Sequence, residues 1–258
     1  MQIEVNKYKQ TFFKYIYWRK GIKALTACHA SIIERVMDVD PRDLKPRISG
    51  LLNRGPVEEY VKEMWIKTGG YFAASTMKRI RGKGADVDLI YKDEALDEMI
   101  DYWEDYFRHY TNERSMFVVG SIMDTQAVIV NNLIDQVVAE AMDEGLSIYQ
   151  IQKRLRDELT KGMTMVNKFQ AECIARTEVN SASNKGSFDS ASQTGLVKSK
   201  EWSTSGLQGV RDSHLLYESM GAVDMTYMYA PGLQYPLDPR GSAKEIINCR
   251  CTHLLNVD

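Results

Sequence analysis

The sequence predicts an α+β protein: a helical N-terminal region followed by a compact C-terminal domain of helices packed on a small, mainly antiparallel sheet. Two observations support this class. Apolar residues recur at helical spacing over most of residues 7–182, which is the pattern of amphipathic helices. After Gly195 the segments become short and alternating, and glycines and prolines that favour turns become frequent. The last third of the chain therefore holds the sheet and its fixed turns.

Helices of the N-terminal region are expected to follow one another with short connections. The first spans about 7–38, and Asp40-Pro41 ends it. The second starts at Pro56, which suits the first helical position, and Gly69-Gly70 is expected to interrupt or kink it. Three more are predicted: one of about 93–110 capped by Asp93, one over 116–144 ending at Gly145, and one capped by Ser147 and closed by Lys161-Gly162.

Aromatic residues crowd the start of the first helix, where Phe12, Tyr15 and Trp18 lie within two turns. This is more aromatic surface than a single stripe can bury within its own domain. Two interpretations stay open. The residues pack in an ordinary core, or they form a docking surface, since large exposed apolar patches usually mark a partner.

Charge patterning does not favour nucleic acid as the main partner, because the net charge is −2 and the pI is about 6.1. One basic cluster stands out. It either supplies cations to a helix C-terminus and a solvated loop or makes sequence-independent phosphate contacts. The acidic helix near residue 100 has no neighbouring His or Cys motif, so a solvated surface is favoured over catalysis. The basic cluster comprises Lys78, Arg79, Arg81 and Lys83.

The C-terminal domain is expected to begin with helices and continue into strands at 197–204, 222–229 and 247–257. Arg176 and Glu178 lie within a helix, where they form either a solvated face or a polar staple to the sheet. The segment 231–243, with three prolines, is a stiff loop.

Four cysteines, at positions 28, 173, 249 and 251, are too few and too uneven for a disulfide scaffold, so reduced thiols are expected. Along a strand, Cys249, Cys251 and His253 would share the core face. Three interpretations stay open: buried thiols packed in the core, a zinc site that also uses His214, or a disulfide. Packing is preferred and no cofactor is predicted, because Cys-x-Cys on a regular strand separates the Cα atoms by about 6.6 Å.

The order of unusual residues in this region resembles the bacteriophage Mu F-like head-morphogenesis (minor head protein) family over about 146–258. The closing Asn-Cys-Arg-Cys after a proline-containing loop is the most specific part. Gln208-Gly209 stands where an acidic residue is expected, so no acidic role is carried to that turn. We place the domain boundary at Gly145, between a helical region 1–145 and a Mu F-like domain 146–258. The motif residues are Arg176, Thr177, Glu178, Trp202, Arg211, His214, Pro236, Asp238, Asn248, Cys249, Arg250 and Cys251.

The resemblance implies a structural role in a tailed-phage virion. Members of the family are minor head components at the portal vertex, made in the host cytoplasm and needed for head assembly or DNA passage. The expected partners are the portal protein and other head proteins, with DNA contact of a non-specific kind. No membrane is expected, because no apolar run is seen that approaches about 18 residues.

Two enzyme classes are alternatives to this role, and assembly is predicted rather than turnover. Arg176 followed by Ser203-Thr204-Ser205 resembles elements of ADP-ribosyltransferases, but no Glu-x-Glu pair follows. A metal-dependent nuclease could use His214, Asn248 and His253, but it lacks nearby carboxylates for a hard metal ion.

Overall fold

A computed structural model describes residues 2–82 and 94–257 of the chain, so the predicted cap Asp93 and the cation Lys83 lie outside the described residues. The chain forms two compact units. Unit 1 comprises Met1–Ile16, Lys62–Thr111 and Cys173–Asp258, and unit 2 comprises Tyr17–Val61 and Asn112–Glu172. These units differ from the boundary expected at Gly145, because both draw on segments from either side of it.

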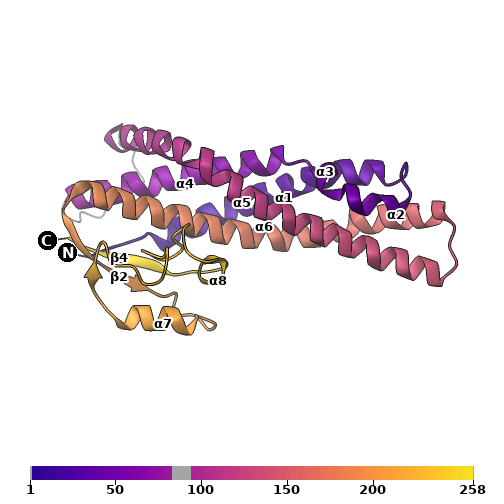
Figure 1. Cartoon of the computed structure of the whole chain (residues 1–258). Helices are drawn as coiled ribbons and strands as arrows, with labels where there is room; N and C mark the ends of the chain where they lie inside the picture. The colour runs from indigo at the N-terminus through magenta and orange to yellow at the C-terminus, as the bar shows by residue number, and fades with distance from the viewer. Residues whose placement is uncertain (1, 83–93, 258) are drawn as a thin grey trace. The chain divides into compact units, whose positions relative to one another are not determined.

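Four long helices contribute residues to both units (Figure 1). They are α1 (Lys7–Arg35), α4 (Gly55–Arg81), α5 (Glu94–Asp143) and α6 (Ile148–Thr194). Short helical turns join α1 to α4, namely α2 (Pro41–Leu44), η1 (Lys45–Arg47) and α3 (Ile48–Leu51).

The predicted interruption at Gly69-Gly70 and the predicted helix ends at residues 111–115 and at Gly162 are wrong, because α4, α5 and α6 run through them. A glycine in a helix interior costs only about 1 kcal/mol relative to alanine, which packing can offset. Thr111 and Ser115 are buried inside α5. Tertiary packing thus overrides the weak local propensity there.

Glycines in unit 1 allow helices to approach closely. A Cβ added at Gly69 would lie 2.6 Å from ring atoms of Phe107 on α5, and one at Gly186 on α6 would lie 2.4 Å from the carbonyl oxygen of Gly69. Because Gly69 has no side chain, the Phe107 ring of α5 packs directly on the backbone of α4. Because Gly186 has none, the backbones of α6 and α4 pack against each other. The glycine pair is therefore a packing feature of α4.

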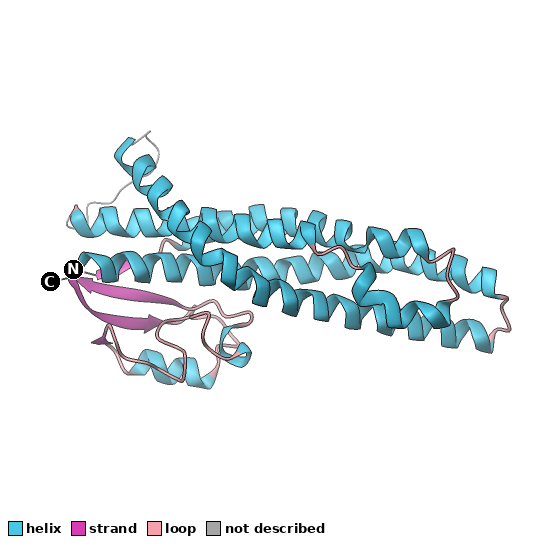
Figure 2. Cartoon of the chain, turned by 45° about the horizontal axis from the view of Figure 1, so that its top comes forward, coloured by secondary structure: helices cyan, strands magenta, loops and turns pink. Residues whose placement is uncertain are grey.

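The sheet of unit 1 has four antiparallel strands in the order β1-β4-β2-β3. Figure 2 shows it between the unit 1 part of α6 and the short helix α7. The predicted α+β class, with a helical N-terminal region and a small antiparallel sheet, is confirmed. The elements are β1 (Gln2–Glu4), β2 (Val197–Ser203), α7 (Asp212–Ser219), β3 (Val223–Asp224), α8 (Ala243–Ile246) and β4 (Thr252–Val257).

Two predicted strands are shorter than expected. The strand predicted over 222–229 is reduced to β3, because Lys200 takes the carbonyl groups of Met225 and Tyr227 as hydrogen-bond acceptors. The strand predicted from residue 247 begins only at Thr252. Asn248 has a φ of 61°, in the left-handed region, which a continuous strand does not allow.

Two apolar clusters surround the sheet. One joins Ile3 of β1 to Leu255 of β4, together with Ile80, Ala191, Val197 and Val257. The other is centred on Trp202 and includes Leu237, Cys249 and Cys251. Because Ile3 pairs directly with Leu255, the first residues of the chain complete the C-terminal sheet.

One stretch of α5, Ser115–Asp143, is apolar and long enough by composition to cross a membrane, contrary to the expectation that no such run exists. Its buried residues, including Ile122, Val130 and Val137, recur at helical spacing, whereas Val128 and Met142 are exposed. That alternation is typical of a helix packed in a bundle, so we assign no membrane span.

Candidate functional site

A stripe of small polar residues on α6 positions the candidate site. Side chains of Asn180, Ser181, Ser183, Asn184 and Ser187 are all buried. Asparagine and serine have poor helix propensity, so a buried run of them needs hydrogen-bond partners to be tolerated. Those partners lie largely in the two segments that precede β4.

Backbone carbonyls of the proline loop and the cysteine segment accept these hydrogen bonds. Asn184 Nδ2 donates to the carbonyls of Pro236 (2.8 Å) and Cys251 (3.1 Å). Ser181 donates to the carbonyl of Leu237, and Asn180 to that of Cys249. One helix therefore fixes two irregular segments whose backbone groups have no strand partner.

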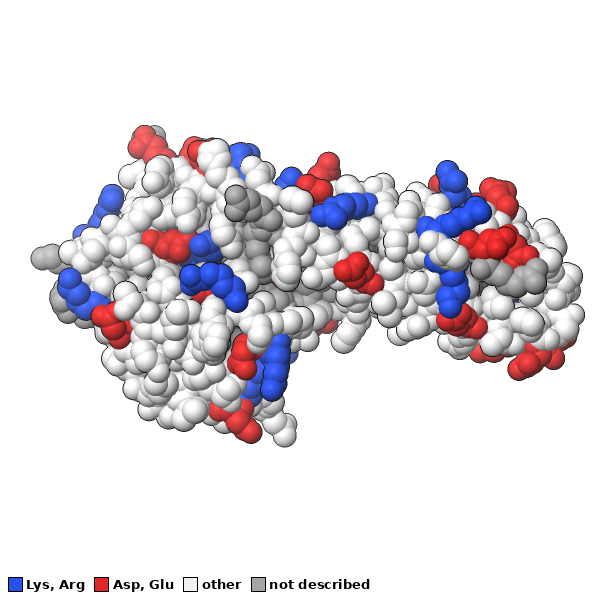
Figure 3. Space-filling model, viewed as in Figure 1, with Lys and Arg blue, Asp and Glu red and all other residues white. Residues whose placement is uncertain are grey.

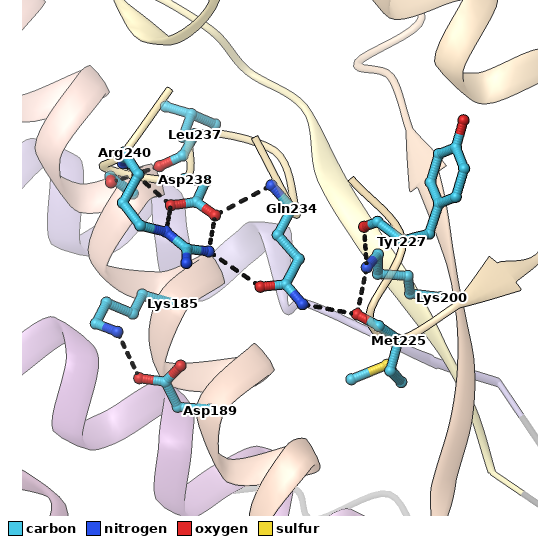
Figure 4. Close-up of polar contacts among 10 residues, drawn as sticks. Lys185, Asp189, Lys200, Met225, Tyr227, Gln234, Leu237, Asp238 and Arg240 are labelled. Carbon is cyan, nitrogen blue, oxygen red and sulfur yellow. Dashed lines mark hydrogen bonds and ion pairs between the residues drawn. The ribbon is translucent and has the colours of Figure 1, made fainter. Parts of the chain in front are cut away.

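The proline loop is closed by a buried carboxylate (Figure 4). Asp238 has no exposed surface, and its oxygens accept bonds from the Arg240 guanidinium at 2.7 and 3.0 Å and from the backbone N–H of Gln234. These charge-assisted bonds hold the pKa of Arg240 above its ordinary value. Leu237, with a φ of 58°, marks the tight turn that this network stabilises.

Lys200 of β2 is fully buried beside this loop (Figure 4). Its ammonium donates to the carbonyls of Met225 at 2.5 Å and Tyr227 at 2.8 Å, and lies 5.3 Å from the centre of the Phe188 ring. Burial lowers the pKa of Lys200 to about 8, against the opposing pull of Asp224 and Asp238. The lysine thus holds the chain after β3 through backbone contacts.

We expect Lys200 to make stability rise with pH in a defined window. Its folded pKa of about 8 lies below the ordinary 10.5, so the unfolded chain binds more protons between these values. Relative to Lys200→Met, the free energy of unfolding of the natural chain should increase from pH 8 to 10.5, by at most about 3 kcal/mol. Urea unfolding at several pH values measures this difference.

The control for this prediction is Lys198→Met on the same strand, because Lys198 is exposed. The difference in the free energy of unfolding between Lys198→Met and the natural chain should not change over the same pH range. If the difference for Lys200→Met is also independent of pH, burial does not lower the pKa of Lys200.

Three ligand-type side chains converge beside Trp202 of β2. His214 of α7 places Nδ1 3.6 Å from Cys249 Sγ and 3.4 Å from Cys251 Sγ, and all three residues are buried. The other ring nitrogen, Nε2, lies 2.9 Å from Glu245 Oε2 of α8. A carboxylate only accepts hydrogen bonds, so Nε2 carries a proton toward Glu245, and Nδ1 is the ring nitrogen that faces the sulfur atoms.

The two thiols do not ionise alike. The hydrogen bond from Cys249, followed by that from His214, lowers the pKa of Cys251. The same contact between the thiols, together with burial, raises the pKa of Cys249. The contact between the two thiols therefore moves their pKa values in opposite directions.

Beside the three side chains lies a pocket of about 40 Å³. Arg211 and Arg250 line it with Ser205 and Gln208. Arg211 is anchored, because its Nη2 donates to the carbonyl of Ile247 at 2.6 Å. The cysteine and histidine side chains thus border a small space that polar groups surround.

Most of the predicted motif residues meet in unit 1. Arg176 donates to Asn248 Oδ1 at 3.1 Å, and Thr177 Oγ1 accepts the Asn248 backbone N–H at 3.0 Å. The Trp202 ring lies 4.9 Å from that of His214. Arg176 therefore acts as the predicted staple, which joins α6 to the segment before β4 rather than to a strand.

Other predicted residues lie apart from the cluster. Glu178 accepts a bond from the Trp65 indole of α4 at 2.9 Å. His253 is buried near the rings of Phe188 and Tyr235, and burial lowers its pKa to about 3. Arg250 is exposed. Within the described residues, the group suited to a metal ion is His214, Cys249 and Cys251, and His253 is not a member of it.

Arg79, a member of the basic cluster at the end of α4, has a structural role. Arg79 Nη1 donates to the carbonyl of Glu4 at 2.7 Å and so joins α4 to β1. Lys78 and Arg81 also lie in the last turn of α4. On the face seen in Figure 3, side chains of both charge signs are interspersed. Phosphate contact by Lys78 and Arg81 stays a prediction.

Sequence reasoning missed Asn180, Ser181, Asn184 and Glu245 as site residues. A signal for the first three is present, because the run Val179–Ser187 places small polar residues where a helix core is expected. Glu245 offers no such signal. It reaches His214 only through the fold, from a four-residue helix that follows the proline loop.

Residues considered for the enzyme alternatives make structural contacts in the described part of the chain. Arg176 lies on α6 and not on a strand. Glu218 is hydrogen-bonded to Thr204 by both carboxylate oxygens. Asn248, one of the residues expected for a nuclease, is held by α6, and His253 lies outside the metal-suited group.

A comparison with known protein families matches the part of the chain that contains this site. The family model of "Phage Mu protein F like protein" matches residues 132–254, a range that contains the polar stripe, the proline loop and the cysteine cluster. The resemblance inferred from the sequence is confirmed over this range.

A particular relative is "Uncharacterized protein YqbB" of Bacillus subtilis (strain 168), which is 30% identical over 128 residues. The aligned part is 47% of this chain and 40% of YqbB, so the chain spans less than half of that protein's length. No solved structure matches the chain.

Proposed function

We propose that this protein is a minor head protein of a tailed bacteriophage and acts at the portal vertex in head assembly or in DNA delivery. The observation that carries the proposal is the Phage Mu protein F match over residues 132–254. The geometry of unit 1 supports a structural role. Its buried polar groups are used to fix backbone segments, and this is what a rigid assembly module requires.

The N-terminal helix offers a surface for a partner, which we propose to be the portal protein. Tyr8, Phe12 and Tyr15 recur at four- and three-residue spacing on α1, and they are 79%, 52% and 56% exposed. They therefore share one helix face in unit 1. Large aromatic side chains often dominate the binding energy of protein interfaces.

Trp18, predicted with this group, is partly buried and donates its indole N–H to the carbonyl of Lys168 at 3.1 Å. We therefore restrict the proposed docking surface to Tyr8, Phe12 and Tyr15.

Incorporation into heads tests the proposal. In the phage or prophage that encodes the chain, the gene is inactivated and complemented, and purified heads are assayed by quantitative mass spectrometry. The natural chain should be present in heads. The double variant Phe12→Ser, Tyr15→Ser should be incorporated at least about tenfold less well, because the interface loses two aromatic anchors.

Point variants are preferable to removal of the N-terminus, because β1 pairs with β4 and truncation would damage the sheet. Phe169→Ser is the matched control, since Phe169 is 68% exposed and belongs to the part of α6 in unit 2. Absence of the natural chain from heads would refute the virion role. Normal incorporation of the double variant with the chain present would refute only the docking surface.

A further inference from the structure

We propose that His214, Cys249 and Cys251 bind a zinc ion. The proposal does not depend on the function in phage heads. It rests on three ligand-type side chains that come from two separate segments of unit 1, are buried, and place all their ligand atoms within 4.8 Å of one another.

The distances suit tetrahedral coordination. Zinc binds cysteine sulfur at about 2.3 Å and histidine nitrogen at about 2.0–2.1 Å, so a sulfur and a nitrogen on one tetrahedral ion lie about 3.6 Å apart. His214 Nδ1 lies 3.6 Å from Cys249 Sγ and 3.4 Å from Cys251 Sγ. Thiolate and imidazole ligands together favour zinc over magnesium or calcium.

Glu245 supplies the support that histidine ligands usually have. Its carboxylate, 2.9 Å from Nε2 of His214, fixes the tautomer in which Nδ1 can bind a metal. Ser213 donates to the same carboxylate oxygen at 3.1 Å and so holds it in place. Two thiolates and a neutral imidazole would balance the charge of Zn²⁺, so the buried site has no net charge.

The backbone removes the objection that Cys-x-Cys on a regular strand spaces the ligands poorly. Asn248 is in the left-handed region, and the N–H of Cys249 bonds to the carbonyl of Ile246, so the chain turns as it reaches the first cysteine. The N–H of Cys251 points at Cys249 Sγ at 3.4 Å, a contact that stabilises a thiolate.

The fourth ligand position opens to the pocket beside the cluster, which is large enough for water. We assign a water molecule to it, because His253, the other histidine of the cysteine segment, lies elsewhere in unit 1.

Metal analysis of the full chain tests the proposal. Protein purified without chelator, and then reconstituted with zinc and desalted, should contain about one zinc per chain. Cobalt substitution should give the intense visible absorption of tetrahedral thiolate coordination. Metal-free protein after reconstitution would overturn the proposal, and so would a Cys249–Cys251 disulfide found by mass spectrometry of unreduced protein.

Zinc binding by single variants distinguishes the zinc ligands from residues that lie near them. Cys249→Ser and Cys251→Ser should each abolish stoichiometric zinc, whereas Cys173→Ser should retain it because Cys173 is outside the cluster. Glu245→Gln should keep the fold and weaken zinc affinity about 10- to 100-fold. Zinc retained in both cluster variants would overturn the assignment. If those variants fail to fold, competition of the natural chain with a chromogenic chelator still decides whether the site exists.

Discussion

Replacing Gly186 with alanine is expected to destabilise unit 1 by about 3 kcal/mol, because the new methyl group has no room. It would lie 2.4 Å from the carbonyl oxygen of Gly69 and 3.1 Å from the backbone nitrogen of Ala73. Both are backbone atoms of α4, so relief requires the two helices to move apart. Urea unfolding measures the change in the free energy of unfolding.

Gly120→Ala in α5 is the matched control. A Cβ at Gly120 meets no described atom within 4 Å, and its φ is not positive. Alanine there should stabilise the chain by about 0.5–1 kcal/mol, because glycine loses more backbone entropy on folding. A loss of stability in Gly186→Ala together with a gain in Gly120→Ala would confirm the close contact at Gly186. Similar effects at both positions would contradict it.

Asn184→Ala is expected to cost about 2–5 kcal/mol. The substitution removes a fully buried donor from the carbonyls of both Pro236 and Cys251, and each carbonyl left unsatisfied costs about 1–3 kcal/mol. The loss should also loosen the segments that flank the site. Urea unfolding gives the energy, and hydrogen exchange over residues 231–251 reports the loosening.

Gln193→Ala, an exposed change on the same helix, should alter the stability by less than about 0.5 kcal/mol. A small effect of Asn184→Ala, with exchange unchanged, would mean that the polar stripe does not hold the proline loop.

The sequence predicts the helices well where apolar spacing is regular, as in α1, and it predicts β2 from its flanking glycines. It overstates helix breaks, because Thr111, Asn112, Ser115 and Gly162 are locally poor helix formers. Tertiary packing keeps these residues in the helical conformation. α6 runs through Gly162, whose φ is not positive, so this glycine marks no turn.

Long-range pairing lies beyond local pattern. β1 is only three residues long, and its partner β4 is near the other end of the chain, so local periodicity does not predict that the two strands pair. The left-handed turn at Asn248 is likewise invisible from alternation alone. That turn is why Cys249 and Cys251 reach His214 together instead of lying on a regular strand.

The candidate site was predictable in composition more than in arrangement. Cys249, Cys251 and His214 follow from residue type, and the burial of both thiols is confirmed. Glu245 and the loop network of Asp238 with Arg240 depend on the fold. A short helix and a proline loop place these groups, and α6 holds the proline loop through side-chain contacts with the loop backbone.

The role at the portal vertex is tested most directly by the position of the chain in assembled heads. A tagged copy that supports normal head yield is located by gold labelling and electron microscopy of purified particles. The account predicts label at a single vertex, the one that carries the tail. Label spread over all vertices or over the shell, or confined to material outside the heads, would contradict it.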